Sequence, residues 1–445
     1  MQSSYNRFPV FQPRIFTTPS KLEARLRPVQ TRKRNYRVLA ALPNQIYSFQ
    51  TSELGLIAAT VAASATFALF VARSMSQSPR VHMAETDANK ALMELCPSLT
   101  SSYRAPWFLI NGHVETIAVA LLRKPPAPVY RREPLPMRDG GAVALDWLEG
   151  PLVKALPDDA PALVLLPGLT GGSEDGYVIH MALAAARAGI RPVVFNSRGT
   201  AHFPVRSPQF YSASYTDDLR AVIKHVGSRF PGAPLLACGW SLGANILVRY
   251  LGEEGEAAPL TAAVSLCNPF NLMLSDRTIS RGFNRIYDRR LADSLRGILS
   301  SHRQIFEQQE SPVDLEKALR CKSIREFDVA VTVPTFGWKS VDDYYAGSSS
   351  CLSIPSVRVP LLCVQAENDP IAPEAAIPYD EIKRNPRCVL VTTQRGGHLG
   401  WVGSEAGGIW GEPWTDKGVI EYLRAALGQR RAVEEEVAVQ EAARA

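Results

Sequence analysis

The sequence has few cysteines, and none of them is paired at the spacing of a metal site or redox motif. Its seven cysteines are scattered along the chain without a C-x-x-C pair. An odd, scattered set excludes a disulfide framework and a zinc site of common spacing, so we expect small buried apolar residues. Carboxylate or cysteine partners at ligand spacing are also missing around His113, His180, His202, His225 and His302. The sequence therefore predicts no metal and no other cofactor.

Internal repeats and low-complexity segments are absent as well. Hydrophobic residues make up 46% of the 445 residues and charged residues 21%, with 30 Gly and 33 Pro. These proportions are typical of globular proteins and exclude collagen-like, coiled-coil and wholly disordered chains.

Acidic residues are scarce in the first fifty positions, where nine Lys and Arg stand against Glu23 alone. This segment carries +8, so the total of +6 leaves −2 for the rest of the chain. Because the excess basic charge lies in residues 1–50, it predicts no nucleic-acid partner for the rest of the chain. An Arg-rich, hydroxyl-bearing segment over residues 1–50 is typical of a transit peptide, here of a chloroplast, with small residues near 37–41. A mitochondrial presequence and a basic tail are the alternatives.

Long hydrophobic runs are limited to residues 54–72, which contain no charge and lie between Glu53 and Arg73. At about 1.5 Å per residue, a helix of that length would span roughly 28 Å, close to a bilayer core. We therefore predict a transmembrane helix and a single-pass membrane protein, in the chloroplast or alternatively in the mitochondrion or endoplasmic reticulum. Seven of these residues are Ala, so a buried or import-related helix is the alternative.

Beyond residue 100, short apolar runs alternate with helical patterns. Strands are expected at 162–169, 192–196, 235–240, 262–267, 360–365 and 388–392, and helices at 177–188, 215–229 and 244–251. Strands that are apolar on both faces and separated by helices indicate a mostly parallel sheet. A charged helical insertion over about 271–358 has the size of a lid. The predicted domain spans 95–428, followed by a solvated tail over 429–445.

A nucleophile motif follows the strand at 235–240. The residues Gly239-Trp240-Ser241-Leu242-Gly243 match G-x-S-x-G and lead into a helix, which is the setting of a nucleophile elbow. The glycines are required because side chains there would collide with the neighbouring strand and helix. The alternative is a serine in a purely structural turn.

A base and an acid follow later strands in the order expected for such a nucleophile. His398 comes after the last predicted strand, and Asp369 after the one before it. We predict that His398 activates Ser241 and that Asp369 orients His398. Glu367 is a weaker candidate for the acid, and Asn268 cannot carry the charge.

The oxyanion requires two backbone donors. We expect the N–H of Leu242, after the nucleophile, and that of Leu169, in the loop 167–172. This loop lacks the residues of a phosphate-binding motif. Arg198 is expected to brace loops.

Two further features have simple interpretations. The H-x4-D string at 82–87 lies outside the predicted framework and is interpreted as chance. Basic side chains around 281–296 form a solvated lid face, with contact to anionic lipid headgroups as the alternative.

Several segments together resemble the plant embryogenesis-associated esterase/lipase family, which is akin to the animal α/β-hydrolase-domain proteins of types 1 to 3. They are residues 107–117, 167–173, 239–243, 323–328, 336–337, 340–345 and 397–398. The resemblance covers about 95–425 and implies an α/β-hydrolase fold with a helical lid. Two departures are Pro167 where many relatives have His, and Glu115 where Gln is usual.

The resemblance and the motifs together predict a serine hydrolase that cleaves carboxylic esters, of acylglycerols or phospholipids at a membrane. One alternative is a lipid acyltransferase that uses the same triad, and another is a non-catalytic binding protein of the same fold. The expected partners are a lipid or other acyl ester substrate and a membrane, while the oligomeric state stays open.

Overall fold

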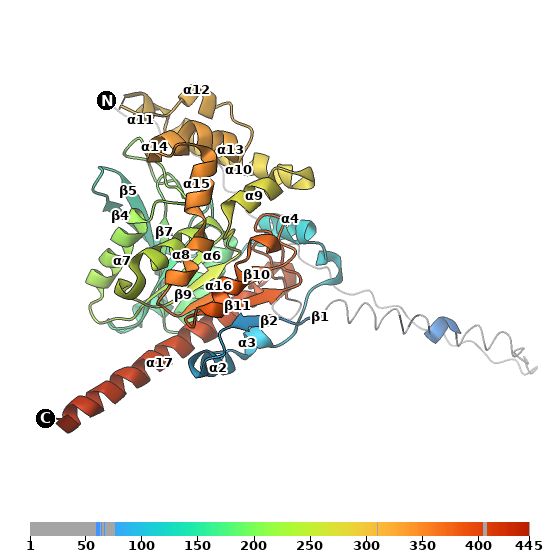
Figure 1. The fold of residues 1–445 in the computed structure, drawn as a ribbon, viewed down its shortest axis with the longest axis vertical. Coiled ribbons are helices and arrows are strands. Elements are labelled where there is room, and N and C mark those ends of the chain that lie inside the picture. Colours follow the sequence, from blue (N-terminus) through green and yellow to red (C-terminus); the bar gives the residue numbers. More distant parts are fainter. Residues whose placement is uncertain are drawn as a thin grey trace, which may run out of the picture. The chain divides into compact units, whose positions relative to one another are not determined.

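The computed structural model describes residues 59–62, 64, 66, 76–308, 310–403 and 407–444. The chain divides into two units, Met1–Ala62 and Ala63–Ala445, and almost all described residues belong to the second. This second unit is built on a nine-stranded sheet of order β2-β11-β10-β9-β8-β6-β7-β5-β4 (Figure 1). A separate pair of short strands, β1 and β3, lies outside it.

The five central strand pairs, from β7 through β6, β8, β9 and β10 to β11, are parallel. Antiparallel strands flank them, with β2 on one edge and β5 and β4 on the other. The strands are β1 Ser76–Gln77, β2 Arg80–Met83, β3 Tyr103–Arg104, β4 Val129–Pro136, β5 Ala142–Glu149, β6 Ala162–Leu166, β7 Arg191–Asn196, β8 Leu235–Trp240, β9 Leu260–Leu266, β10 Leu361–Ala366 and β11 Cys388–Thr393.

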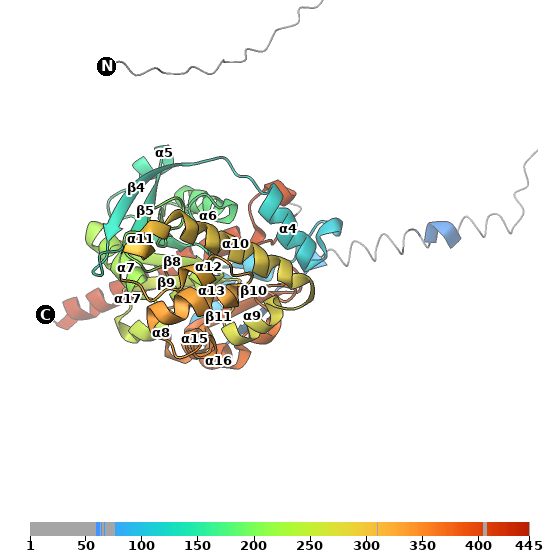
Figure 2. The ribbon, with the colours of Figure 1, turned by 90° about the horizontal axis from the view of Figure 1, so that it is seen from above.

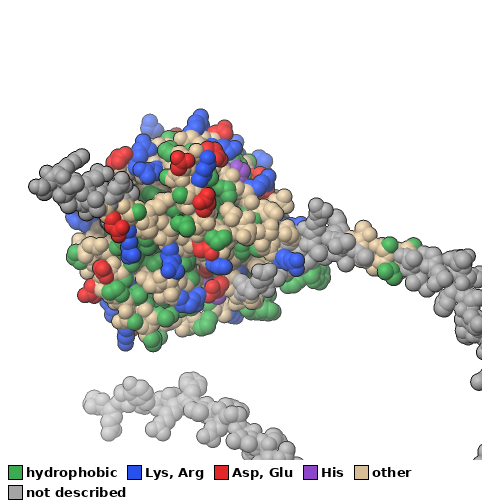
Figure 3. Space-filling view, turned by 90° about the horizontal axis from the view of Figure 1, so that it is seen from below, with side chains coloured by type: hydrophobic (Ala, Val, Ile, Leu, Met, Phe, Trp, Pro, Cys, Tyr) green, Lys and Arg blue, Asp and Glu red, His purple; other side chains and the backbone are tan. Residues whose placement is uncertain are grey.

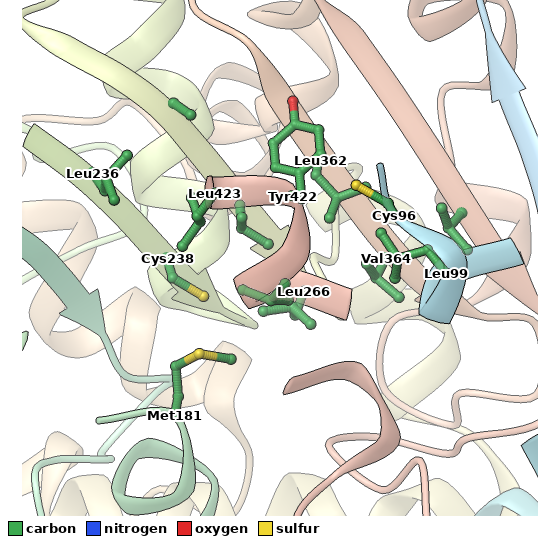
Figure 4. Close-up of a cluster of buried hydrophobic side chains, with 14 of the residues drawn as sticks. Cys96, Leu99, Met181, Leu236, Cys238, Leu266, Leu362, Val364, Tyr422 and Leu423 are labelled. Atoms are coloured by element: carbon green, nitrogen blue, oxygen red, sulfur yellow. The ribbon is translucent and has the colours of Figure 1, made fainter. Parts of the chain in front are cut away.

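Helices cover both faces of the sheet. Those outside the insertion are α2 Asp87–Glu94, α3 Pro97–Thr100, α4 Gly112–Leu122, α5 Pro151–Lys154, α6 Gly176–Arg187, α7 Asp217–Arg229, α8 Leu242–Glu254, α16 Tyr379–Arg384 and α17 Trp414–Arg444. Successive side chains of a strand point to opposite faces. On β6, Leu163 and Leu165 therefore join one core cluster with α2, α3, α6 and α17, part of which Figure 4 shows. Val164 and Leu166 join the other, with α7, α8 and α16.

The predicted parallel framework and its strands are confirmed to within a few residues. The sheet is larger than predicted, because the antiparallel strands β2, β4 and β5 extend it. β4 lies at an exposed edge and contains polar residues and two prolines, so it lacks a continuous apolar run. β2 contains His82 and pairs with β11, so the unit includes residues before the expected boundary at 95.

The expected helical insertion lies between β9 and β10. Its helices are α9 Leu272–Ile279, α10 Arg285–Ser301, α11 Arg303–Gln308, α12 Leu315–Ala318, α13 Ile324–Phe327, α14 Val333–Phe336 and α15 Val341–Ser348. It forms a layer over one end of the sheet, with α11 and α12 uppermost in Figure 1, and the view from above looks onto this layer (Figure 2). Its own apolar cluster includes Leu299, Phe306 and Phe327. This layer is the lid.

The remaining surface carries charges of both signs. Figure 3 shows Lys and Arg interspersed with Asp and Glu on the face opposite the lid. This mixture is expected because the chain after residue 50 has little net charge. α17 continues without a break to Arg444, so the described part of the predicted tail is the end of this helix, and Arg431 and Glu435 on it are exposed. All seven cysteines are free, and six are buried as predicted.

The predicted transit segment, residues 1–50, lies outside the described residues. Of the predicted membrane segment 54–72, only 59–62, 64 and 66 are described, all helical and exposed. Nowhere in the described chain is a helix both long enough and apolar enough to cross a bilayer. The predicted localisation as a single-pass membrane protein is therefore wrong, and nothing in the described chain supports the chloroplast or another organelle.

Candidate active site

Ser241 lies in a strained turn between β8 and α8. Its backbone has φ +51° and ψ −119°, a conformation that L residues adopt only where the surrounding structure enforces it. A Cβ on Gly243 would lie 2.2 Å from the Leu166 carbonyl oxygen, and one on Gly239 would lie 2.7 Å from that of Gly243. Only glycine fits at either position, so the G-x-S-x-G motif is required by the close packing of strand and helix.

Ser241, His398 and Asp369, which are far apart in the sequence, meet at the lid end of the sheet. His398 Nε2 lies 3.1 Å from Ser241 Oγ, and His398 Nδ1 lies 2.7 Å from Asp369 Oδ2. The other carboxylate oxygen of Asp369 accepts the N–H groups of Ile371 at 2.7 Å and Ala372 at 2.9 Å. With Nδ1–H bound to the carboxylate, Nε2 is left to accept the serine proton.

Helix α4 holds the loop that carries His398. The backbone N–H of His398 donates to Thr116 Oγ1 at 2.8 Å, and the Thr116 hydroxyl in turn donates to the Gly112 carbonyl at 2.6 Å. The loop is also tied to the turn that carries the acid, because the Gly397 N–H donates to Asn368 Oδ1 at 2.9 Å. A Cβ on Gly112 would lie 2.1 Å from the Asn368 carbonyl oxygen, so the helix begins directly against that turn.

The far side of the same loop is held by two charged residues of α4 and its end. Arg123 donates to the carbonyls of Leu399 at 3.0 Å and Gly400 at 2.8 Å. Glu115 Oε1 accepts the Val402 N–H at 2.9 Å, while its Oε2 has no partner in the described chain. Burial raises the pKa of Glu115 to about 7, although the Val402 N–H and Arg123 act in the opposite direction.

Sequence reasoning did not assign these positioning roles. The segment 107–117 belongs to the family resemblance, and the local signal in it is Asn111, a capping residue before a helix. The Asn111 side chain caps α4 by accepting the N–H groups of His113 and Val114. A local pattern of this kind predicts where a helix begins but not what it packs against.

Two cavities meet at Ser241. One lies under the lid and is largely apolar; its lining includes Leu242, Pro269, Ile279, Leu295 and Phe327. The other lies between α4 and the loop after β6, and its lining includes Thr116, Thr170, Tyr177 and His398. Leu169 borders both.

The two predicted oxyanion donors border the same space. In the part of the chain that the structure describes, the N–H groups of Leu242 and Leu169 donate to no protein acceptor. The residues on either side of Leu169 are fixed, because the Gly168 N–H donates to Tyr177 Oη at 3.0 Å and the Thr170 N–H to Tyr211 Oη at 2.8 Å.

The lid segments of the family resemblance meet around a buried carboxylate. Asp328 accepts the hydroxyls of Thr332 at 2.6 Å and Tyr345 at 2.7 Å. Burial raises the pKa of Asp328 to about 6. The neighbouring Tyr344 Oη accepts the Ala213 N–H at 2.9 Å. These bonds shape the wall of the apolar cavity.

The other residues considered from the sequence lie elsewhere. Glu367 pairs with Arg80, whereas the carboxylate bonded to His398 is that of Asp369. Arg198 is buried and donates two bonds of 2.7 Å to Asp218, which is the bracing role predicted for it. His82 lies in β2, where its Nε2 is 3.2 Å from Thr392 Oγ1.

Comparisons with known proteins agree with this architecture. Residues 161–400 match the family model described as "alpha/beta hydrolase fold". The chain is 51% identical to the "Embryogenesis-associated protein EMB8" of Picea glauca over 343 residues, 76% of this chain and 75% of that one. It is 34% identical to the "Phospholipase ABHD3" of Mus musculus over 81% of this chain and 88% of that one. It is also 35% identical to the "Monoacylglycerol lipase" of Saccharomyces cerevisiae, over 57% of this chain and 58% of that one.

Proposed function

Because the chain belongs to the α/β-hydrolase fold family and to its embryogenesis-associated branch, we propose that it is a serine hydrolase of lipid carboxylic esters. The observation that carries the proposal is the hydrogen-bonded chain from Ser241 through His398 to Asp369. A serine hydroxyl is a weak nucleophile, and an imidazole held by a carboxylate activates it.

The reaction begins with attack of Ser241 Oγ on the ester carbonyl. His398 Nε2 accepts the serine proton and then donates it to the departing alcohol, which leaves an acyl group on Ser241. Water, deprotonated by His398, attacks this acyl ester, and His398 returns the proton to Ser241 Oγ as the carboxylic acid is released. Asp369 keeps the imidazole in the required tautomer and stabilises its charged form.

The N–H groups of Leu242 and Leu169 bind the oxyanion in this proposal. Both border the cavity at Ser241, and both lack a protein acceptor in the described chain. Donors that are fixed before the reaction stabilise the developing charge without a cost of reorganisation. The bonds to Tyr177 and Tyr211 supply that fixation for Leu169.

The substrate class follows from the cavity under the lid. Its apolar lining suits an acyl chain, and the more polar cavity beside His398 suits the alcohol portion of the ester. The relatives named as a phospholipase and a monoacylglycerol lipase support acylglycerol or phospholipid esters.

A probe experiment tests the proposal. Ser241→Ala is expected to abolish labelling by a fluorophosphonate and to lower hydrolysis of a p-nitrophenyl ester by at least about 10⁴-fold. Ser356→Ala, at an exposed serine, is the matched control and should label normally. Labelling of Ser241→Ala at the wild-type rate would refute the assignment. Product analysis with and without an added alcohol separates hydrolysis from acyl transfer.

A further inference from the structure

Exposed large apolar side chains are concentrated on and around α4, a helix that lines the site. Of the fifteen in the described chain, nine lie on or around α4 and the start of α10. Six belong to α4 and the turn before it: Trp107, Phe108, Ile110, Val114, Leu121 and Leu122. Clusters of this kind mark interaction surfaces, whereas single exposed apolar residues need no explanation.

The other three extend the same surface. Trp410, at 69% exposure, neighbours Ile409, which packs against Val119 of α4. Phe283 and Ile286 lie at the start of α10, and the Phe283 ring contacts His113 of α4 with centroids 4.8 Å apart. Figure 2 shows α4 beside the lid. We call these nine side chains the docking face.

The lid side of the docking face is basic. Five arginines are exposed, and none forms an ion pair in the described chain: Arg277, Arg281, Arg285, Arg289 and Arg290. The acid among residues 277–290 is Asp288, which is buried and accepts the Ile324 N–H. Arg289 and Arg290 lie three and four positions after Ile286, so charge and apolar surface are neighbours on α10.

The two helices that carry most of the docking face also line the site. The cavity that contains His398 is lined by Val119 and Ala120 of α4 and by Leu291 of α10. The outer sides of these two helices carry the exposed apolar and basic groups. A surface that these groups contact would therefore lie against the two helices that line the cavity.

We propose that the docking face binds the surface of an anionic phospholipid bilayer, with its aromatic and aliphatic side chains at the headgroup boundary and the five neighbouring arginines on the phosphates. Unpaired arginines beside exposed tryptophans complement an anionic lipid surface in charge and in apolar character. The inference rests on the proposed lipid ester hydrolysis, since it places that site against its substrate. The contact is peripheral and needs no helix that crosses the bilayer.

Vesicle cosedimentation of the full chain tests the proposal, with vesicles of phosphatidylcholine alone or mixed with phosphatidylglycerol. Wild type is expected to bind the anionic vesicles more tightly. Arg281→Ala/Arg285→Ala and Trp107→Ser/Phe108→Ser are each expected to weaken that binding about tenfold or more. Leu352→Ser/Arg138→Ala, also at exposed positions, is the control and should bind as wild type.

Hydrolysis of soluble p-nitrophenyl butyrate separates this proposal from the proposed function. The docking variants should keep it within about twofold, because these side chains are exposed. The arginine variant tests the surface even if the aromatic variant fails to fold. Vesicle binding by both variants equal to that of wild type would overturn the inference. A change in self-association with unchanged vesicle binding would also overturn it, since the face would then join two copies of the chain.

Discussion

Substitution of Glu115 by Gln is expected to remove a pH-dependent loss of stability. Glu115 is 1% exposed, and burial raises the pKa of its carboxyl from 4.5 to about 7. The folded state therefore binds a proton more tightly than the unfolded state. Its stability falls as the pH rises from about 4.5 to about 7, and it is unaffected below that window.

The magnitude follows from the pKa difference. At about 1.4 kcal/mol per pKa unit, the wild type loses about 3 kcal/mol across this window relative to a variant that cannot ionise there. Gln retains a carbonyl oxygen to accept the Val402 N–H. The difference in unfolding free energy between Glu115→Gln and wild type should therefore shift by about 3 kcal/mol in favour of the variant between about pH 5 and about pH 8.

Urea unfolding at several pH values measures this difference. Glu149→Gln, at an exposed strand end, is the control and should parallel wild type. If the curves of Glu115→Gln and wild type also run parallel, the reasoning about the buried carboxylate is refuted.

Two further predictions concern positioning and packing. Thr116→Val leaves the buried His398 N–H without an acceptor, so it should cost about 1–3 kcal/mol of stability and lower kcat more than it raises KM. Thr116→Ser keeps the hydroxyl and should restore both stability and kcat. Equal kinetics for the Val and Ser variants would contradict this role of Thr116. Gly243→Ala places a Cβ 2.2 Å from the Leu166 carbonyl oxygen and should cost about 3 kcal/mol or more of stability, with loss of activity. Gly297→Ala in α10, where a Cβ would meet nothing within 4 Å, should instead stabilise the protein by up to about 1 kcal/mol. Thermal unfolding measures both changes.

The parallel strands and the residues at their ends were predictable because each signal is local. An apolar run followed by Gly-Trp-Ser-Leu-Gly identifies β8 and Ser241, and the ends of β10 and β11 identify the positions of Asp369 and His398. The carboxyl ends of parallel strands meet at one edge of a sheet, so the meeting of these residues follows from the topology.

The edge strands and the role of α4 were not predictable in the same way. β2 and β4 are short or polar, and their place in the sheet depends on partners far along the chain. Glu115 and Thr116 show no pattern that distinguishes them from other helical residues. Their roles appear only when the loop after β11 packs on α4, which tertiary structure alone determines.

The bond between His398 and Thr116 joins residues 282 positions apart. The pairing of Val389 in β11 with Met83 in β2 spans a separation of the same order. Both contacts close long loops, so both are expected to form after contacts that are local in sequence, such as the serine turn and the helices. During refolding, esterase activity should therefore return after the circular dichroism of the helices. Activity in this chain depends on both ends of the α/β-hydrolase unit having come together, so a formed serine turn alone does not indicate a complete fold.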